Sequence, residues 1–254
     1  MRLEGTVGLV TGGGTGIGRA VAEHLARAGA RAVVLNFSRS EDEAGATAKA
    51  MAGLGSEGVP MRADVSDDAQ VRALMAAIGE RFGRLDVLVN NAGTTAFIPY
   101  PDLDAVTDEV WDRLLGVNVK GAFNCSRAAA GRLREARGAI VNVSSIAGLR
   151  AIGSSIPYGV SKAALTHLTR SLAMVLAPEV RVNAVVPGIV ATRWFRRGFG
   201  EEAAMAQEEA AAGTTPLAGV ATADHVAQAV MGLIGADFVT GETLIVDGGR
   251  HLAY

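Results

Sequence analysis

The fold can be inferred from one segment near the start of the chain, Val7-Gly8-Leu9-Val10-Thr11-Gly12-Gly13-Gly14-Thr15-Gly16-Ile17-Gly18. Residues 7–11 are mostly apolar, which is typical of a buried strand, and an amphipathic helical pattern over 17–28 follows the glycines directly. Glycines let backbone N–H groups approach a pyrophosphate, and a helix N-terminus adds unsatisfied donors and about half a positive charge. The segment therefore predicts a strand, a loop and a helix that together bind phosphate groups.

The spacing of the glycines distinguishes this loop from other phosphate-binding loops. Gly12, Gly16 and Gly18 form the pattern G-x-x-x-G-x-G, which differs from the dinucleotide pattern G-x-G-x-x-G. The phosphate loop of nucleotide hydrolases is disfavoured, because Arg19 and Ala20 stand where Lys and Ser or Thr are required. A tight turn without a ligand is the alternative, but five glycines cost folding entropy that a plain turn would not require.

Beyond this segment, short β-branched or leucine-rich runs alternate with alanine-rich segments of helical period, which predicts βαβ units and a parallel sheet. The predicted strands are Val7–Thr11, Ala32–Phe37, Gly58–Ala63, Leu85–Asn90, Ala139–Ser144, Val180–Val186 and Thr243–Val246. The predicted helices cover 17–28, 40–53, 67–82, 107–135, 158–177 and 223–234, with Asp67 and Thr222 as caps. Because the crossover helices must cover both faces of the sheet, the sequence predicts a single doubly wound, Rossmann-like α/β domain over residues 1–254.

Composition limits the partners and the compartment. The chain has 254 residues, a formal net charge of −2 and no run of Lys or Arg, so a nucleic-acid partner is not expected. No apolar run approaches the roughly 18–20 residues of a membrane span, and the first residues lack the apolar stretch of a signal peptide. The sequence thus predicts a cytoplasmic protein without a membrane partner.

Cysteine and histidine give no sign of a metal site. The single cysteine, Cys125, is expected to be a small buried apolar group. The histidines form no ligand pattern with cysteine or carboxylates, so no metal is predicted and each is expected on the surface or in helix packing. They are His24, His167, His225 and His251.

Three polar side chains in the second half of the chain predict carbonyl chemistry that depends on a dinucleotide. Tyr158 and Lys162 are four residues apart, and Ser145 lies thirteen positions before the tyrosine. If Tyr158 opens a helix, this spacing places the phenol and the ammonium on one face, with Cβ atoms roughly 5–6 Å apart. The positive charge would favour the phenolate and lower a pKa that is ordinarily about 10, as a general acid–base near neutral pH requires.

Two further segments follow predicted strands at the edge where open α/β sheets bind ligands. Asp64 and Val65 come after the third strand, and Asn90-Asn91-Ala92-Gly93 comes after the fourth. We expect both segments to line one crevice. Ordinary turn chemistry is the alternative for either segment alone.

Residues 189–217 interrupt the alternation of strands and helices. They carry aromatic and basic side chains before an acidic, alanine-rich stretch: Trp194, Phe195, Phe199, Arg193, Arg196 and Arg197. Long loops inside a compact domain are usually functional, so we expect a substrate lid whose aromatic residues form an apolar wall. An amphipathic surface patch is the alternative.

Together these motifs resemble those of the short-chain dehydrogenase/reductase family, in its subfamily of about 250 residues. The resemblance spans nearly the whole chain. The motifs that carry it are Thr11-Gly12-x-x-x-Gly16-Ile17-Gly18, Asn90-Asn91-Ala92-Gly93, Asn118 within Val117-Asn118-Val119-Lys120-Gly121, Ser145, Tyr158-x-x-x-Lys162, Pro187-Gly188 and Val246-Asp247-Gly248-Gly249.

The resemblance implies a role for each catalytic residue. Tyr158 would be the general acid in reduction and the base in oxidation, Ser145 would hold the substrate oxygen, and Asn118 would anchor a proton-relay water. Lys162 would lower the pKa of Tyr158 and bind the nicotinamide ribose, and Thr192 would contact the carboxamide. The predicted cofactor-binding residues are Gly12, Thr15, Gly16, Ile17, Gly18, Asn36, Ser38, Arg39, Asp64, Val65, Asn91, Ala92, Gly93, Tyr158, Lys162, Pro187, Gly188 and Thr192.

The end of the second strand bears on the choice between NADP(H) and NAD(H). A carboxylate there would bind the adenosine ribose of NAD and repel a 2′-phosphate, but this chain has Asn36. Ser38 and Arg39 add a hydroxyl and a guanidinium that suit a phosphate, so NADP(H) is favoured. The acidic residues at 41–43 weaken the local positive field, which leaves NAD(H) or dual use open.

The leading functional prediction is an NADP(H)-dependent carbonyl reductase or alcohol dehydrogenase, similar to β-ketoacyl carrier-protein reductases and glucose dehydrogenases. An epimerase or dehydratase of the extended branch needs a longer C-terminal domain. A serine hydrolase would require G-x-S-x-G, which residues 143–147 do not contain. A nucleotide-binding regulator or scaffold without turnover is the remaining alternative, against which the intact Ser145, Tyr158 and Lys162 argue. The sequence does not reveal the small-molecule substrate.

The two longest predicted helices indicate self-association. Apolar residues spread around much of the 158–177 helix, and a helix that is apolar nearly all round is a buried helix. The sheet can cover only part of it, so we expect a second copy of the chain to cover the rest, with the 107–135 helix beside it. The resemblance implies a closed homodimer or homotetramer. Burial by helices and loops of the same chain is the alternative.

Overall fold

Seven parallel strands form the central sheet of the computed structural model, which describes residues 1–193, 196, 198 and 200–253. The strands are β1 (Val7–Thr11), β2 (Ala32–Phe37), β3 (Glu57–Arg62), β4 (Val87–Asn90), β5 (Ala139–Val143), β6 (Arg181–Pro187) and β7 (Thr243–Val246). Their order in the sheet is β3-β2-β1-β4-β5-β6-β7. The order reverses between β1 and β4, and ligands of such sheets bind at the carboxyl ends of the strands at this switch point.

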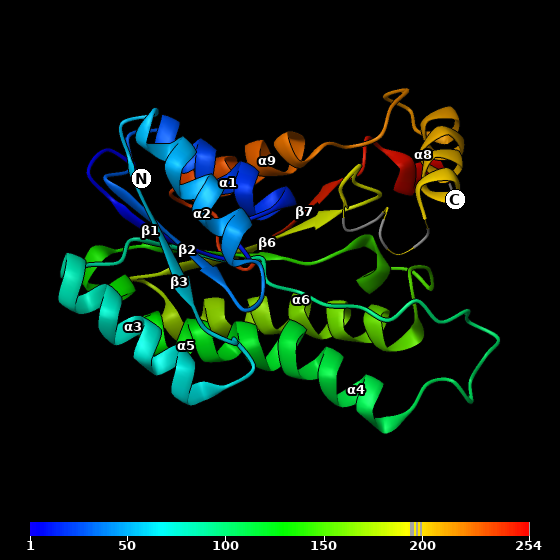
Figure 1. The fold of residues 1–254 in the computed structure, drawn as a ribbon, viewed down its shortest axis with the longest axis horizontal. Coiled ribbons are helices and arrows are strands. Elements are labelled where there is room, and N and C mark those ends of the chain that lie inside the picture. Colours follow the sequence, from blue (N-terminus) through cyan, green and yellow to red (C-terminus); the bar gives the residue numbers. More distant parts are fainter. Residues whose placement is uncertain (194–195, 197, 199, 254) are drawn as a thin grey trace.

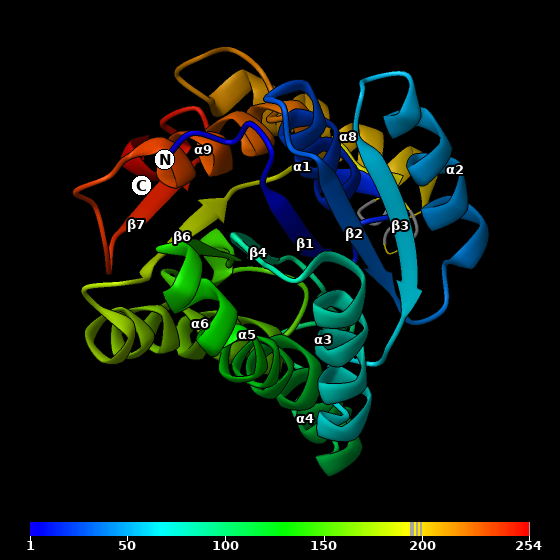
Figure 2. The same cartoon turned by 90° about the vertical axis from the view of Figure 1, so that its left-hand side faces the viewer.

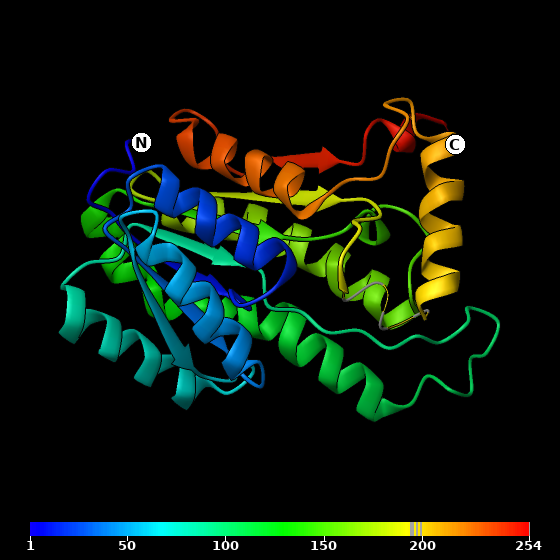
Figure 3. The ribbon, with the colours of Figure 1, turned by 45° about the horizontal axis from the view of Figure 1, so that its top comes forward.

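Helices cover both faces of the sheet, as the sequence predicted (Figures 1 and 2). One face carries α1 (Gly16–Arg27), α2 (Glu41–Ala52) and α9 (Ala223–Gly235), and the other carries α3 (Asp68–Phe82), α5 (Ala122–Ala136) and α6 (Ile156–Leu176). Helix α8 (Glu201–Thr214) stands beyond the carboxyl ends of the strands, close to the C-terminus (Figure 3). No helix within the described ranges is both long enough and apolar enough to cross a membrane.

The core consists of two apolar layers, one on each face of the sheet. Every residue of β1, β2, β4 and β5 is buried, which is why these strands read as continuous apolar runs. Leu25 of α1 and Val230 of α9 lie in one layer, and Ile78 of α3 and Leu172 of α6 lie in the other. Cys125 is also in the second layer, where burial raises the pKa of its thiol to about 12.

The predicted 107–135 helix is wrong as one regular element. The structure has α4 (Asp108–Leu115), a π-helical turn (Gly116–Gly121) and then α5. A Cβ atom on Gly121 would lie 2.6 Å from Cγ2 of Val65, so the glycine lets the turn press against the end of β3. Apolar periodicity does not reveal such a wide turn, and π turns are frequent at functional sites. The other predicted elements differ only at their ends, for example β4, which begins at Val87 rather than Leu85.

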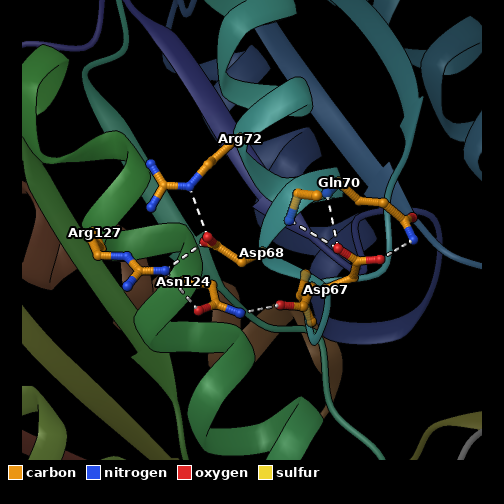
Figure 4. A network of polar contacts seen from close by, with 8 residues as sticks. Asp67, Asp68, Gln70, Arg72, Asn124 and Arg127 are labelled. Carbon is orange, nitrogen blue, oxygen red and sulfur yellow. Dashed lines mark hydrogen bonds and ion pairs between the residues drawn. The ribbon is translucent and has the colours of Figure 1, made fainter.

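A polar network between α3 and α5 fixes the turn after β3 (Figure 4). Asp67 caps α3, as predicted, by accepting two hydrogen bonds from main-chain N–H groups of its first turn. Asn124 on α5 donates to the carbonyl of Val65 at 3.1 Å, and Arg127 on the same helix pairs with Asp68 at 2.5 Å. The network therefore holds the segment after β3 against the rim of the sheet, where the predicted crevice lies.

Candidate active site

The glycine loop after β1 forms a cradle that has no room for side chains. A Cβ atom on Gly18 would lie 2.3 Å from the Gly12 carbonyl oxygen, and one on Gly14 would lie 2.8 Å from the main-chain nitrogen of Ala44. Gly12 and Gly16 have φ angles of 63° and 52°, a left-handed region that favours glycine. The cradle leads into the N-terminus of α1, so main-chain N–H groups and the helix dipole face the same space.

Asn91 ties the cradle to β4 across the switch point. Its Nδ2 donates to the carbonyls of Thr11 at 2.9 Å and Gly12 at 3.1 Å. In return, Oγ1 of Thr11 accepts from the main-chain N–H groups of Asn91 at 3.0 Å and Ala92 at 2.9 Å. The structure thus brings together the glycine loop and the Asn90–Gly93 segment, which are far apart in the sequence.

Two predicted cofactor residues at the ends of β2 and β3 line the cleft but direct hydrogen bonds into the protein. The Asn36 amide donates to the Ala63 carbonyl at 2.9 Å, and the residue is only 1% exposed. Oδ1 of Asp64 accepts from the main-chain N–H and the hydroxyl of Ser66, at 2.9 and 2.7 Å. Asn36 therefore connects β2 to the end of β3 through a hydrogen bond, which its position in the sequence did not predict.

The rim of the cleft beyond these residues carries two guanidinium groups. Ser38 and Arg39, both predicted, lie exposed after β2 and line the cleft. Arg62 also lines it, because the register of the sheet places this last residue of β3 opposite Phe37. The sequence analysis missed Arg62, although a parallel register between the predicted second and third strands would have indicated it.

Ser145 and Tyr158 meet at the centre of the cleft. Ser155 caps α6 by accepting from the main-chain N–H of Tyr158 at 3.4 Å, which places the tyrosine in the first turn of the helix. The hydroxyl of Ser145 forms a hydrogen bond with the phenol of Tyr158. Ser144, the neighbouring candidate, is buried and donates to the main-chain carbonyl of Lys162 at 2.9 Å. The serine that faces the phenol is therefore Ser145.

Lys162 is almost completely buried below the tyrosine. Its Nζ donates to the carbonyl of Val143 at 2.9 Å and lies 5.8 Å from the centre of the Tyr158 ring. Burial lowers the pKa of Lys162 to about 8. Burial also raises the pKa of Tyr158, and the hydrogen bond from Ser145 only partly opposes this effect. The expected lowering of the phenol pKa by the lysine charge is therefore not the dominant effect. Desolvation of the buried phenol outweighs it, and the spacing of Tyr158 and Lys162 in the sequence does not reveal that burial.

Asn118 lies behind the cleft, in the π-helical turn. Its Nδ2 donates to the Thr94 carbonyl and to Oγ of Ser161, both at 2.9 Å, and its Oδ1 accepts from the Thr94 N–H at 2.8 Å. A Cβ atom on Gly93 would lie 3.5 Å from this Oδ1 and 3.6 Å from Nζ of Lys162. Both amide hydrogens of Asn118 are thus committed to holding the turn against the strand ends.

The predicted lid contains helix α8 and several ion pairs. Thr192 lies beside the cradle, with its Cγ2 atom 3.8 Å from the position of a Cβ on Gly16. Arg193 pairs with Glu43 of α2 at 2.7 Å, and Arg196 pairs with Glu201 at 2.8 Å. The remaining lid residues of interest lie outside the described residues: Trp194, Phe195, Arg197 and Phe199.

One continuous cleft of ≈ 1550 Å³ connects these groups, which exceeds the roughly 300–1,000 Å³ of a typical small-molecule site. All predicted site residues line it except Gly18 and Asn118, which support it from behind. His251 lines it as well, a place in the cleft that its position in the sequence did not predict. Within the described part of the chain, no three His, Cys, Asp or Glu side chains are grouped as metal ligands.

A glycine cradle at the switch point that opens onto a Ser–Tyr–Lys group is typical of oxidoreductases that bind a nicotinamide dinucleotide. Comparison with known proteins agrees with this class. A family model described as enoyl-(acyl carrier protein) reductase matches residues 12–251.

Individual relatives match over almost their whole length. "Granaticin polyketide synthase putative ketoacyl reductase 2" of Streptomyces violaceoruber is 46% identical, with 98% of this chain and 97% of that protein covered. The 3-oxoacyl-[acyl-carrier-protein] reductase FabG of Thermotoga maritima is 34% identical, with 98% and 99% covered. A solved structure, "Crystal structure of a putative short-chain dehydrogenase/reductase from Burkholderia xenovorans", has a TM-score of 0.90 at 33% identity, with 97% of this chain and 98% of that chain covered. The chain belongs to the short-chain dehydrogenase/reductase family and is an NAD(P)-dependent oxidoreductase.

Proposed function

We propose that this protein interconverts a carbonyl compound and a secondary alcohol with NADP(H), and that Tyr158 is the general acid and base. The observation that carries the proposal is the hydrogen bond between Ser145 and Tyr158 in the same cleft as the glycine cradle. Two relatives named as ketoacyl reductases support a β-ketoacyl compound or a related ketone as the substrate class.

The glycine cradle fits the pyrophosphate of a dinucleotide. Close packing excludes side chains from Gly14 and Gly18, which lets main-chain groups line the cleft beside the N-terminus of α1. Such N–H groups bind anions without a charged side chain. Thr15, Gly16 and Ile17 would hold the phosphates, while Pro187, Gly188 and Thr192 would hold the nicotinamide end.

When bound, the nicotinamide supplies or accepts the hydride. In the direction of reduction, Ser145 donates a hydrogen bond to the carbonyl oxygen, and Tyr158 delivers a proton to the same oxygen. Both donors lie where negative charge develops, and this is the arrangement that stabilises a transition state. In oxidation, Tyr158 takes the proton back from the alcohol.

Lys162 supports this proton transfer from below. Because its pKa is about 8, the ammonium is mostly protonated near neutral pH, and its fixed position keeps a positive charge near the phenol. Ribose hydroxyls of a bound dinucleotide would accept from the same group. Asn118, whose side chain is fully engaged, keeps the π-helical turn and the proton-relay water that we expect there in place.

The choice of NADP(H) rests on charge at the rim of the cleft. Arg39 and Arg62 both line the end of the cleft next to β2 and β3. Asn36 occupies the place where a carboxylate would repel a 2′-phosphate. Guanidinium groups bind phosphate through several parallel hydrogen bonds, so two of them favour the phosphorylated cofactor.

The test is a panel of ketones, β-ketoacyl thioesters and secondary alcohols, followed at the nicotinamide absorbance with NADPH, NADH and their oxidised forms. We expect turnover with NADPH that is lost in Tyr158→Phe. Cofactor binding without turnover on the whole panel would instead support a nucleotide-binding regulator or scaffold.

We also propose that the chain assembles into a homodimer or homotetramer through α5 and α6. The rest of the chain buries part of these helices but leaves four of their apolar side chains exposed. Phe123, Val160, Met174 and Val175 are 38%, 45%, 82% and 68% exposed. Such surfaces commonly mark interfaces. Light scattering coupled to size exclusion tests this, and a single species near 26.0 kDa would contradict it.

A further inference from the structure

The turn that follows β7 forms one wall of the cleft, on the same side as the predicted lid. Asp247 and His251 line the cleft together with Tyr158. The guanidinium of Arg150 donates to the His251 carbonyl, which ties the turn to the segment that follows Ser145. Figure 3 shows the C-terminus beside α8 at the end of the molecule where the strands finish. The turn therefore faces the space that remains for a substrate.

The lid also contacts this turn, so the wall is held on two sides. The N–H of Leu217, at the end of the lid, donates to the Gly248 carbonyl at 3.2 Å. A Cβ atom on Gly248 would lie 2.5 Å from Cγ2 of Thr215. The residues after Gly248 thus have a defined position in the fold, although they are close to the end of the chain.

Asp247 fixes the imidazole of His251 within this wall. The carboxylate is 5% exposed and accepts from the main-chain N–H groups of Gly249 at 2.9 Å and His251 at 2.8 Å. Nδ1 of His251 lies 2.9 and 3.1 Å from its two oxygens. A carboxylate can only accept, so Nδ1 carries a proton, and in the neutral form of the ring Nε2 is then an acceptor.

Nε2 of His251 is available to a substrate. It has no hydrogen-bond partner among the residues that the structure describes, while the side chain is 28% exposed on the cleft. Several contacts therefore fix Nδ1 of the ring and leave Nε2 without a partner among the described residues, on a side chain that lines the same cleft as Tyr158. A hydroxyl group is the simplest donor that would satisfy it.

We propose that His251 is a specificity-determining residue whose Nε2 accepts a hydrogen bond from a hydroxyl group of the carbonyl substrate, with Asp247 as the positioning residue. The inference rests on the proposed function and names a substrate class for it, the hydroxylated ketones. A carboxylate has no proton to give to Nε2 of the neutral ring, so the neutral ring selects a hydroxyl rather than a carboxylate. The hydroxyl binds at a distance from the carbonyl that Ser145 and Tyr158 hold.

The test uses methyl ketones that carry a terminal hydroxyl, methoxy or carboxylate group, in a series of chain lengths, each paired with the plain ketone of equal length. In the wild type, kcat/KM for the hydroxyketone should exceed that of the plain ketone by about tenfold at the matching length, the value of one hydrogen bond. In His251→Phe this ratio of hydroxyketone to plain ketone should fall to near one.

Asp247→Asn gives a second readout that a purely structural role would not produce. Both carboxylate oxygens of Asp247 accept from main-chain N–H groups, and an asparagine keeps only one acceptor oxygen, so the imidazole would lose its fixed orientation. The hydroxyketone preference should then fall toward one although His251 is still present, and it should fall through KM rather than kcat. His251→Gln, which keeps an acceptor, should retain part of the hydroxyl preference if the phenylalanine variant is too unstable to assay.

His167→Phe, at an exposed position on α6 outside the cleft, is the matched control. A hydroxyl preference that is equal in the wild type and His251→Phe would overturn the inference while turnover of plain ketones leaves the proposed function intact. Loss of a carboxylate preference in His251→Phe would overturn it in favour of an anion site. A wild type that reduces none of the series contradicts the proposed function, and the inference with it.

Discussion

Main-chain atoms form the wall at the cradle end of the cleft, whereas long side chains form it at the lid end. No Cβ fits at Gly18, because the Gly12 carbonyl is too close. At the lid, Arg193 reaches Glu43 through an ion pair in which both side chains are at least one-third exposed. A substitution that overpacks closely packed backbone lowers stability strongly, whereas the loss of an exposed ion pair lowers it little. The cradle therefore tolerates little change, whereas the end of the cleft at the predicted lid tolerates more.

Tyr158→Phe should have the largest effect on turnover, because it removes the group that transfers a proton, in the part of the cleft between the glycine cradle and the predicted lid. We expect kcat to fall by about 10²–10⁴-fold while NADPH affinity stays nearly unchanged, since the lost hydroxyl transfers the proton and the other predicted cofactor-binding residues stay in place. Steady-state kinetics and calorimetric titration measure the two quantities. Tyr100→Phe is the control, because that phenol donates to the Ile152 carbonyl and does not line the cleft. A variant that retains most of its kcat would remove Tyr158 from the mechanism.

Lys162→Met tests how much stability the buried charge costs. Burial lowers the pKa of Lys162 to about 8, whereas a lysine in the unfolded chain has a pKa of about 10.4. Between these values the unfolded state binds more protons, so the free energy of unfolding of the wild type should rise with pH through this window. Relative to Lys162→Met, the rise should approach ~3 kcal/mol in total.

Urea denaturation of both proteins over this pH range measures the difference. Lys120→Met, which removes a lysine at an exposed position, is the matched control. If the difference in free energy of unfolding between the wild type and Lys162→Met stays constant from neutral to alkaline pH, Lys162 has an ordinary pKa in the folded protein.

Gly18→Ala tests the packed end of the comparison. The new Cβ would meet the Gly12 carbonyl at 2.3 Å, so the cradle must shift. Overpacking of this kind costs about 1–3 kcal/mol, which would weaken NADPH binding by about 10–100-fold if the shift is confined to the cradle. Gly45→Ala is the control, because a Cβ there meets nothing within 4 Å. Equal cofactor affinities for the two variants would contradict a cradle defined by close packing.

A smaller effect is expected at the charged rim. The double variant Arg39→Gln, Arg62→Gln should lower NADPH affinity by about tenfold and leave NADH affinity unchanged, since only the 2′-phosphate contacts are lost. Titration with both cofactors measures this. Arg72→Gln, on α3 and outside the cleft, should change neither affinity. Equal losses for NADPH and NADH would mean that these arginines bind a group that both cofactors share.

The seven strands and most members of the cleft could be predicted, because both follow from local patterns. The apolar runs of β1, β4 and β5 predict buried parallel strands. The glycine spacing of the Gly12–Gly18 loop predicts a tight conformation that excludes side chains at the glycines. Residues at the carboxyl ends of parallel strands then meet without any further information.

What the sequence did not predict depends on side-chain partners and burial. Asn36 turned out to join β2 to β3, because its amide meets the Ala63 carbonyl rather than the rim. The pKa of Tyr158 follows desolvation more than the lysine charge. His251 lies in the cleft only because Asp247 and Arg150 hold the turn after β7 there. Contacts between distant segments decide each case, and no local pattern records them.

The smallest effect should come from Arg193→Gln, which removes the ion pair between the lid and α2. Exposed pairs contribute about 0.2–1 kcal/mol, so the dissociation rate of NADPH should rise by up to a few-fold. Because salt screens exposed charges, the difference between wild type and variant should shrink as ionic strength rises. Stopped-flow displacement of NADPH at low and high salt measures it, with Arg19→Gln, whose Glu23 partner lies on the same helix, as the control. A salt-independent change would mean that Arg193 contacts the cofactor itself. The end of the cleft at the predicted lid would then tolerate substitution as poorly as the cradle does.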